Sequence, residues 1–155
     1  MLERISKYHI DRILGQGAMG IVYMATDEAS NQTVVIRTLH PQFIQDKAGL
    51  EFAQRFSSEA SAAIPCKHEN LISIYEVGQD QDIPFVVMEF VKGYGLDRLL
   101  QSLSPLPLEC ISDFFLGICA GLAYAHQQGF VHRSLKPTNI LVLEDDTIKI
   151  ADLGI

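Results

Sequence analysis

The chain contains no tryptophan, only three cysteines, and fewer basic than acidic residues. Cys66, Cys110 and Cys119 lie far apart and form no Cys-x-x-Cys pair, so neither a disulfide framework nor a zinc-type ligand pattern is present. The 12 Lys and Arg residues against 19 Asp and Glu give a net charge of −7. This charge disfavours a nucleic acid or an anionic lipid surface as a partner. We expect reduced thiols and no nucleic-acid binding.

The sequence also lacks internal repeats, low-complexity tracts and long hydrophobic runs. Its first residues, MLERISKYHIDRI, alternate charged and apolar side chains and lack the apolar core of a signal peptide. The longest apolar stretch, 114–125, is shorter than the roughly 20 residues that span a bilayer. Because 48% of the residues are hydrophobic, a packed core is expected. These features predict a globular, cytoplasmic protein without membrane contact.

The first 91 residues are predicted to be mostly strands. β-Branched and aromatic residues gather in short segments that Gly, Asp, Asn and Ser separate. One helix interrupts them over 48–64, where apolar residues recur at intervals of three and four before Pro65. The predicted strands are 8–14, 21–26, 33–39, 72–77 and 85–89.

Residues 92–155 are predicted to be mainly helical. A linker is expected at 92–95, followed by one long helix whose first turn contains Pro107 and whose end is capped by Gly129. A short hairpin is then predicted from 140–143 and 147–150. The change in pattern predicts two regions, 1–91 and 92–155.

A glycine-rich motif, G-x-G-x-x-G, occupies positions 15–20. Alone it is a weak signal, because dinucleotide-binding folds and ordinary turns contain the same spacing. In a dinucleotide-binding enzyme the loop opens a helix. Here the segment 21–25, Ile-Val-Tyr-Met-Ala, is typical of a strand. A glycine loop between two strands, which can hold phosphate through its backbone N–H groups, is therefore favoured over a dinucleotide-binding site.

Four further segments follow in a defined order. They are Val34-Val35-Ile36-Arg37 on a predicted strand, Glu59 on the predicted helix, HRSLKPTN at 132–139, and Asp-Leu-Gly at 152–154. Together with the glycine loop they resemble the motifs of protein kinases. The resemblance covers essentially the whole chain and looks closest to the bacterial, eukaryotic-like Ser/Thr protein kinases. It implies an α+β, protein-kinase-like fold: an antiparallel-sheet small lobe with one helix over 1–91, and an incomplete, mainly helical large lobe over 92–155.

The resemblance also implies an ATP site with Mg²⁺. The Mg²⁺ ligands would be Asn139 and Asp152, and Lys136 would contact the γ-phosphate. Ser134 stands at the position of the catalytic Asp. The nucleotide-binding positions implied are Leu14, Gly15, Gly17, Gly20, Val22, Val35, Arg37, Glu59, Met88, Glu89, Val91 and Leu141.

Three of these positions depart from the kinase pattern. Ser134 replaces an Asp that accepts the substrate hydroxyl proton, and serine has no useful basicity near neutral pH. A loss on the order of 10²–10⁴ in rate is expected. Arg37 replaces a Lys, and its flat guanidinium could bind Glu59 yet align the phosphates poorly. Val35 replaces an Ala and could crowd the adenine ring.

The sequence ends three residues after Asp152, and we therefore expect a truncated kinase domain without an activation segment. The apolar stripe of the long helix is then expected to be exposed and to meet a protein partner. Three functions stay open: an inactive pseudokinase with a regulatory or scaffolding role, a weak Ser/Thr protein kinase, and a non-functional remnant of a disrupted kinase gene.

Overall fold

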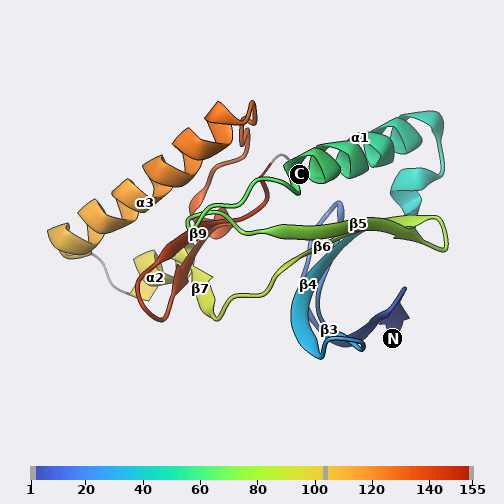
Figure 1. Cartoon of the computed structure of the whole chain (residues 1–155), viewed down its shortest axis with the longest axis horizontal. Coiled ribbons are helices and arrows are strands. Elements are labelled where there is room, and N and C mark those ends of the chain that lie inside the picture. Colours follow the sequence, from blue (N-terminus) through green and yellow to red (C-terminus); the bar gives the residue numbers. More distant parts are fainter. Residues whose placement is uncertain (1–2, 103–104, 154–155) are drawn as a thin grey trace. The chain divides into compact units, whose positions relative to one another are not determined.

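The computed structural model describes residues 3–102 and 105–153, which form two compact units (Figure 1). Unit 1 contains the residues up to Ile64 together with Ile74–Phe90. Unit 2 contains Pro65–Ser73 together with the residues from Val91 onward. Pro65–Ser73, which the sequence pattern assigned to the first region, therefore packs with the second.

Unit 1 is built on one antiparallel sheet with the strand order β1-β2-β3-β4-β6-β5. The predicted strands are all present, with longer bounds in most cases, and a short first strand and a 3-10 turn were not predicted. The elements are β1 (Arg4–Ile5), β2 (Tyr8–Gln16), β3 (Gly20–Asp27), β4 (Gln32–Leu39), η1 (Pro41–Ile44), α1 (Lys47–Ala63), β5 (Ile74–Asp80) and β6 (Ile83–Glu89).

Helix α1 follows the predicted apolar period. Its N-terminus is capped by Asp46, whose carboxylate accepts a hydrogen bond of 2.7 Å from the Gly49 N–H. A stripe of small residues and one aromatic, centred on Phe56, is buried, and the helix ends shortly before Pro65. The stripe contacts β5 and β6, along which the helix lies in Figure 1.

The sheet of unit 1 curls until its two edges meet. The Tyr8 hydroxyl donates a 2.7 Å hydrogen bond to the Glu76 carboxylate, and the Ser6 N–H donates one of the same length to Asp80. Burial raises the pKa of Tyr8 to about 12, and its bond to Glu76 acts in the same direction. The curled sheet encloses a core made of Ile5, Tyr8, Ile10, Tyr23, Ala25, Val34, Ile36, Phe85 and Val87.

Gly20, the last glycine of the loop, packs so closely against β4 that no side chain fits there. A Cβ atom on Gly20 would lie 1.7 Å from the Thr38 carbonyl oxygen on β4, whereas one on Gly15 would meet nothing within 4 Å. We expect Gly20→Ala to lower the free energy of unfolding by about 2–3 kcal/mol through overpacking. Gly15→Ala should change it by less than about 1 kcal/mol. Urea denaturation of both variants checks this, and equal effects would contradict it.

The described residues of unit 2 form a three-stranded antiparallel sheet, β7-β8-β9, two α-helices and one short 3-10 helix. The predicted hairpin is confirmed. The predicted linker at 92–95 is wrong, because three of its residues form a strand that pairs with β8. Gly93 allows this pairing, since a Cβ there would lie 2.4 Å from the Val142 carbonyl oxygen. The elements are β7 (Gly93–Gly95), α2 (Leu96–Ser102), α3 (Leu108–Gln127), η2 (Pro137–Asn139), β8 (Ile140–Leu143) and β9 (Ile148–Ile150).

Helix α3 is the predicted long helix. Gly129, with φ +84°, follows it and donates its N–H to the His126 carbonyl. Gly117 and Gly121 face Asn70 and β9, where a Cβ on Gly121 would lie 2.9 Å from the Asn70 carbonyl oxygen. The remaining face is apolar and largely exposed.

Among the described residues, α3 is the one helix with the length and hydropathy of a possible membrane span. The helix extends beyond the apolar run at 114–125 on both sides. Of its most apolar 18-residue stretch, 17% is buried within the protein. One such helix is weak support for a membrane location, because helices that pack in soluble proteins share these properties.

Candidate functional site

The candidate nucleotide-binding residues of unit 1 lie largely on one face of its sheet. In the strand register Val22 opposes Arg37, and Val35 opposes Met88. Directly opposed residues share a face, and residues two apart on a strand do as well. These four side chains therefore lie together, on the face opposite Tyr23 and the core of the curled sheet.

The glycine loop joins β2 to β3 and is held from two directions. Across the loop, the Gly17 N–H donates a 2.9 Å hydrogen bond to the Gly20 carbonyl. From the end of β4, His40 donates its backbone N–H to the Met19 carbonyl (2.9 Å), and its ring Nε2 lies 3.0 Å from the Gly17 carbonyl oxygen. The space around Gly15 and Gly17 is open, so an anion could approach their backbone.

His40 was not among the residues selected from the sequence. It lies 20 or more residues from the loop that it contacts, and no motif marks it. The end of β4 brings it to the loop, because β4 pairs with β3 along its whole length. Leu14, which precedes the first glycine, is 40% exposed.

The acidic candidates of unit 1 come from two elements. Glu59 is half-buried on α1, three residues after the buried Phe56. Glu89 ends β6 and opposes Val34 on β4. Arg37, in the middle of β4, is half-buried as well. Glu59 and Arg37 are thus partly removed from solvent, where opposite charges interact more strongly than at an open surface.

In unit 2, hydrogen bonds fix the backbone of the segment 132–139. The Ser134 N–H donates to the His132 carbonyl (2.8 Å), and the Ser134 carbonyl accepts from the Asn139 side-chain amide (2.9 Å). The Ser134 side chain is exposed, whereas Asn139 is buried. The loop therefore presents the hydroxyl of Ser134 to solvent from a well-held backbone position.

The same segment is tied to the residue before Asp152. The Ala151 N–H donates to the Asn139 carbonyl (2.8 Å), and the buried His132 ring Nε2 lies 2.8 Å from the Ala151 carbonyl oxygen. The two candidate metal ligands, Asn139 and Asp152, are consequently brought together. His132 therefore positions Ala151 next to the segment 132–139. It was not predicted as a site residue, although the motif at 132–139 contains it.

Two residues of this region have a strained backbone. Arg133 (φ +62°) and Asp152 (φ +61°) adopt the left-handed conformation, which costs energy for residues other than glycine. Asn31 and Asp146, which share this conformation, lie in hairpin turns, where it is ordinary. Arg133 and Asp152 lie in no such turn, and strain of this kind gathers at functional sites.

The donor set fits Mg²⁺. Because the Asn139 amide nitrogen donates to Ser134, its oxygen is the atom left to bind a cation, and Asp152 adds a carboxylate. Mg²⁺ prefers oxygen ligands and usually takes its remaining ones from water and phosphates. Within 3–102 and 105–153 no three His, Cys, Asp or Glu side chains cluster as a metal site, so such outside ligands would be needed.

Three other candidate residues also belong to unit 2. Lys136 is exposed and immediately precedes η2. Leu141 is half-buried on β8, opposite Gly95 on one side and Lys149 on the other. Val91 is half-buried at the start of the unit, and Gly154 lies outside the described residues.

The model of the family described as "Protein kinase domain" matches residues 8–155. The chain belongs to the protein kinase family, which confirms the fold class and the resemblance seen in the motifs. It is 38% identical over 154 residues to the serine/threonine-protein kinase PrkC of Bacillus subtilis, covering 99% of this chain and 23% of PrkC. It is 37% identical over 150 residues to a probable serine/threonine-protein kinase of Clostridium acetobutylicum, covering 97% of this chain and 22% of that protein.

A solved structure is similar over the whole chain. The crystal structure of the Mycobacterium tuberculosis PknI kinase domain has a TM-score of 0.81 and 26% sequence identity, and the match covers 100% of this chain and 63% of that one. The chain thus spans less than a quarter of the two bacterial relatives named above and about two thirds of this kinase domain.

Proposed function

We propose that this chain is the nucleotide-binding part of a Ser/Thr kinase domain that binds Mg²⁺-ATP but transfers phosphate poorly, and that it acts as a pseudokinase with a regulatory or scaffolding role. The observation that carries this is Ser134. Its backbone is held by His132 and Asn139, yet its side chain is a hydroxyl with no useful basicity.

In this proposal the apolar face of the sheet binds adenine. In unit 1, Val22, Val35 and Met88 would contact the ring and the backbone of Glu89 would hydrogen-bond its edge. Val91 and Leu141 are the adenine-binding positions proposed in unit 2. The supporting observation is the register that aligns the first three residues on one face.

The phosphates would meet the glycine loop and Arg37 of unit 1, and Lys136 is the phosphate contact proposed in unit 2. Arg37 would be oriented by Glu59, and its planar guanidinium can bind a carboxylate in a bidentate manner. Asn139 and Asp152 would hold Mg²⁺, which neutralises the phosphate charge when it is bound. The bonds of Asn139 and His132 to Ala151 support this pair.

A second candidate function is that of a weak Ser/Thr protein kinase. It is favoured by the retention of Lys136, Asn139 and Asp152, because phosphoryl transfer depends mainly on positioning and charge stabilisation. The two candidates differ in rate, and a measurement of γ-phosphate transfer separates them.

We expect Mg²⁺-ATP to raise the melting temperature of the chain. At a ligand concentration of 100 times Kd, a ligand that binds only the native state adds about 2.7 kcal/mol of stability, or roughly 5–10 °C for a chain of this size. Asp152→Asn should remove the Mg²⁺-dependent part. Asp146→Asn is the matched control, since Asp146 is an exposed Asp with nearly the same φ. No shift in the unsubstituted chain would contradict nucleotide binding.

The exposed face of α3 is proposed as a packing surface for another protein segment. Leu108, Phe115 and Leu116 are 76%, 65% and 68% exposed, and Ile111 and Phe115 border an apolar hollow of about 420 Å³. Surfaces of this kind are uncommon unless something covers them.

A cytoplasmic location is proposed as well, in keeping with ATP as ligand and with the free state of all three cysteines.

A further inference from the structure

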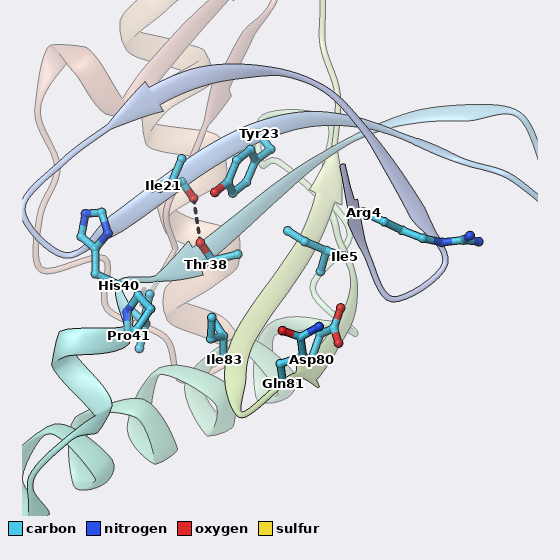
Figure 2. A pocket seen from close by; sticks show the side chains of 11 residues that line it. Arg4, Ile5, Ile21, Tyr23, Thr38, His40, Pro41, Asp80, Gln81 and Ile83 are labelled. Atoms are coloured by element: carbon cyan, nitrogen blue, oxygen red, sulfur yellow. Dashed lines mark hydrogen bonds between the residues drawn. The ribbon is translucent and has the colours of Figure 1, made fainter. Parts of the chain in front are cut away.

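A cavity of about 260 Å³ opens at one end of the curled sheet of unit 1 (Figure 2). It lies on the core side of the sheet, where Tyr23 is located, and therefore on the face opposite Arg37 and Met88. Its apolar walls are Ile5, Ile21, Tyr23, Leu39, Pro41 and Ile83. The proposed nucleotide site does not use these residues.

The size of the cavity sets the size of a ligand. An apolar cavity of about 150 Å³ is large enough to bind benzene. A cavity of 260 Å³ therefore accommodates a two-ring aromatic molecule, and its largely apolar wall favours such a body over a sugar or a phosphate.

Two hydroxyl groups line the otherwise apolar wall. The Thr38 hydroxyl points to the Ile21 carbonyl at 3.5 Å, as drawn in Figure 2, and it also interacts with the Tyr23 hydroxyl. Burial raises the pKa of Tyr23, so its phenol stays protonated at neutral pH. The pair can exchange hydrogen bonds with one polar group of a ligand.

The charges at the rim are already engaged. Arg4 forms an ion pair with Glu28 and a 2.9 Å hydrogen bond with the Ser6 carbonyl, and in Figure 2 its guanidinium points away from the cavity. Asp80 accepts the 2.7 Å hydrogen bond from the Ser6 N–H. The Arg4 charge is thus directed away from the cavity, and the largely apolar wall, which would leave a buried charge without hydration, favours a neutral ligand.

The wall of the cavity also supports the glycine loop. His40 lines the cavity, and its ring lies 3.0 Å from the Gly17 carbonyl oxygen. Thr38 lines it too, and its carbonyl oxygen is the atom against which Gly20 packs. A molecule in the cavity would restrict both contacts and hence the backbone of the loop.

We propose that this cavity binds a neutral two-ring aromatic molecule with one hydroxyl or N–H group, and that its occupancy tightens nucleotide binding through His40 and the glycine loop. Once one ligand has ordered the loop, the second loses less conformational entropy on binding. The coupling rests on the proposed nucleotide site, whereas the cavity site does not.

Titration of 2-naphthol, followed by methyl NMR of the isoleucines in the full chain, tests the site. We expect shifts at Ile5, Ile21 and Ile83, with a Kd on the order of 0.1–1 mM for a ligand of this size. Thr38→Val should weaken binding roughly 3–10-fold by removing one hydroxyl. Ile83→Phe should abolish binding by filling the mouth. Leu50→Phe, at an exposed site on α1 outside the cavity, should leave it unchanged.

A second titration tests the coupling. Saturating 2-naphthol should tighten Mg²⁺-ATP binding about five-fold, and ATP should tighten 2-naphthol by the same factor. His40→Phe should bring this mutual factor close to one, whatever the affinity of the variant for each ligand alone. Absent methyl shifts, or equal binding by the Ile83→Phe variant, overturn the site. Binding of both ligands without mutual effect overturns the coupling. Binding of 2-naphthol to a chain that does not bind ATP overturns the nucleotide proposal and leaves the cavity site standing.

Discussion

Replacing Ser134 by Asp is expected to raise the rate of γ-phosphate transfer by about 10²–10⁴-fold, the range that a positioned general base contributes. A carboxylate can accept the proton of the attacking hydroxyl, whereas the Ser134 hydroxyl cannot at neutral pH. No other single substitution proposed for this chain has an expected effect of this size on the reaction.

The surrounding structure should accept the new carboxylate. The bonds that hold position 134 involve its backbone N–H and carbonyl, which Asp retains, and the side chain is exposed. The Asp side chain would therefore leave the loop from the same point as the serine hydroxyl. No packing has to change, and the substitution should cost less than about 0.5 kcal/mol in stability.

The measurement is transfer of labelled γ-phosphate from Mg²⁺-ATP to the protein itself and to a generic protein substrate. Ser134→Asn is the matched control, because it has nearly the size and shape of Asp without its basicity, and it should give no gain. Asp152→Asn added to Ser134→Asp should return the rate to background. A gain with Asn equal to that with Asp would show that the absence of a base does not limit this chain.

The motifs predicted the family because their order and spacing are fixed by chemistry. The strand after the glycine loop disfavoured a dinucleotide-binding helix, and the motifs at 34–37, 132–139 and 152–154 followed it in the order typical of kinases. The strands were predicted from their β-branched and aromatic residues, and the helices from apolar residues that recur at intervals of three and four.

The features that sequence reasoning missed depend on contacts between distant segments. Gly93–Gly95 has the composition of a linker, and it forms a strand because β8 supplies a partner. His40 and His132 act through bonds to Gly17 and Ala151 that no local pattern indicates. Tertiary pairing, rather than local propensity, decides all of these positions.

Phe85→Ala is expected to lower the free energy of unfolding of unit 1 by about 3–5 kcal/mol, the largest stability effect proposed for this chain. Phe85 is 2% exposed in the core of the curled sheet, and its ring packs edge-on against Tyr8 with centroids 6.5 Å apart. Its removal leaves a cavity that the two sheet edges, held by Glu76 and Asp80, cannot readily close. Urea denaturation measures the loss, with Leu50→Ala, at a 51% exposed site on α1, as the control within the same unit.

Truncating an exposed aromatic side chain on α3 should, by contrast, have little effect on the stability of the chain. Phe115 is 65% exposed, so Phe115→Ala removes little buried area and should change the stability of this chain by less than about 0.5 kcal/mol. If α3 is a packing surface, the same substitution should weaken binding of the segment that covers it by about 1–2 kcal/mol, because a buried aromatic side chain contributes strongly to an interface. A large loss of stability from Phe115→Ala in the isolated chain would mean that the ring is already buried there and that α3 is not available to a partner.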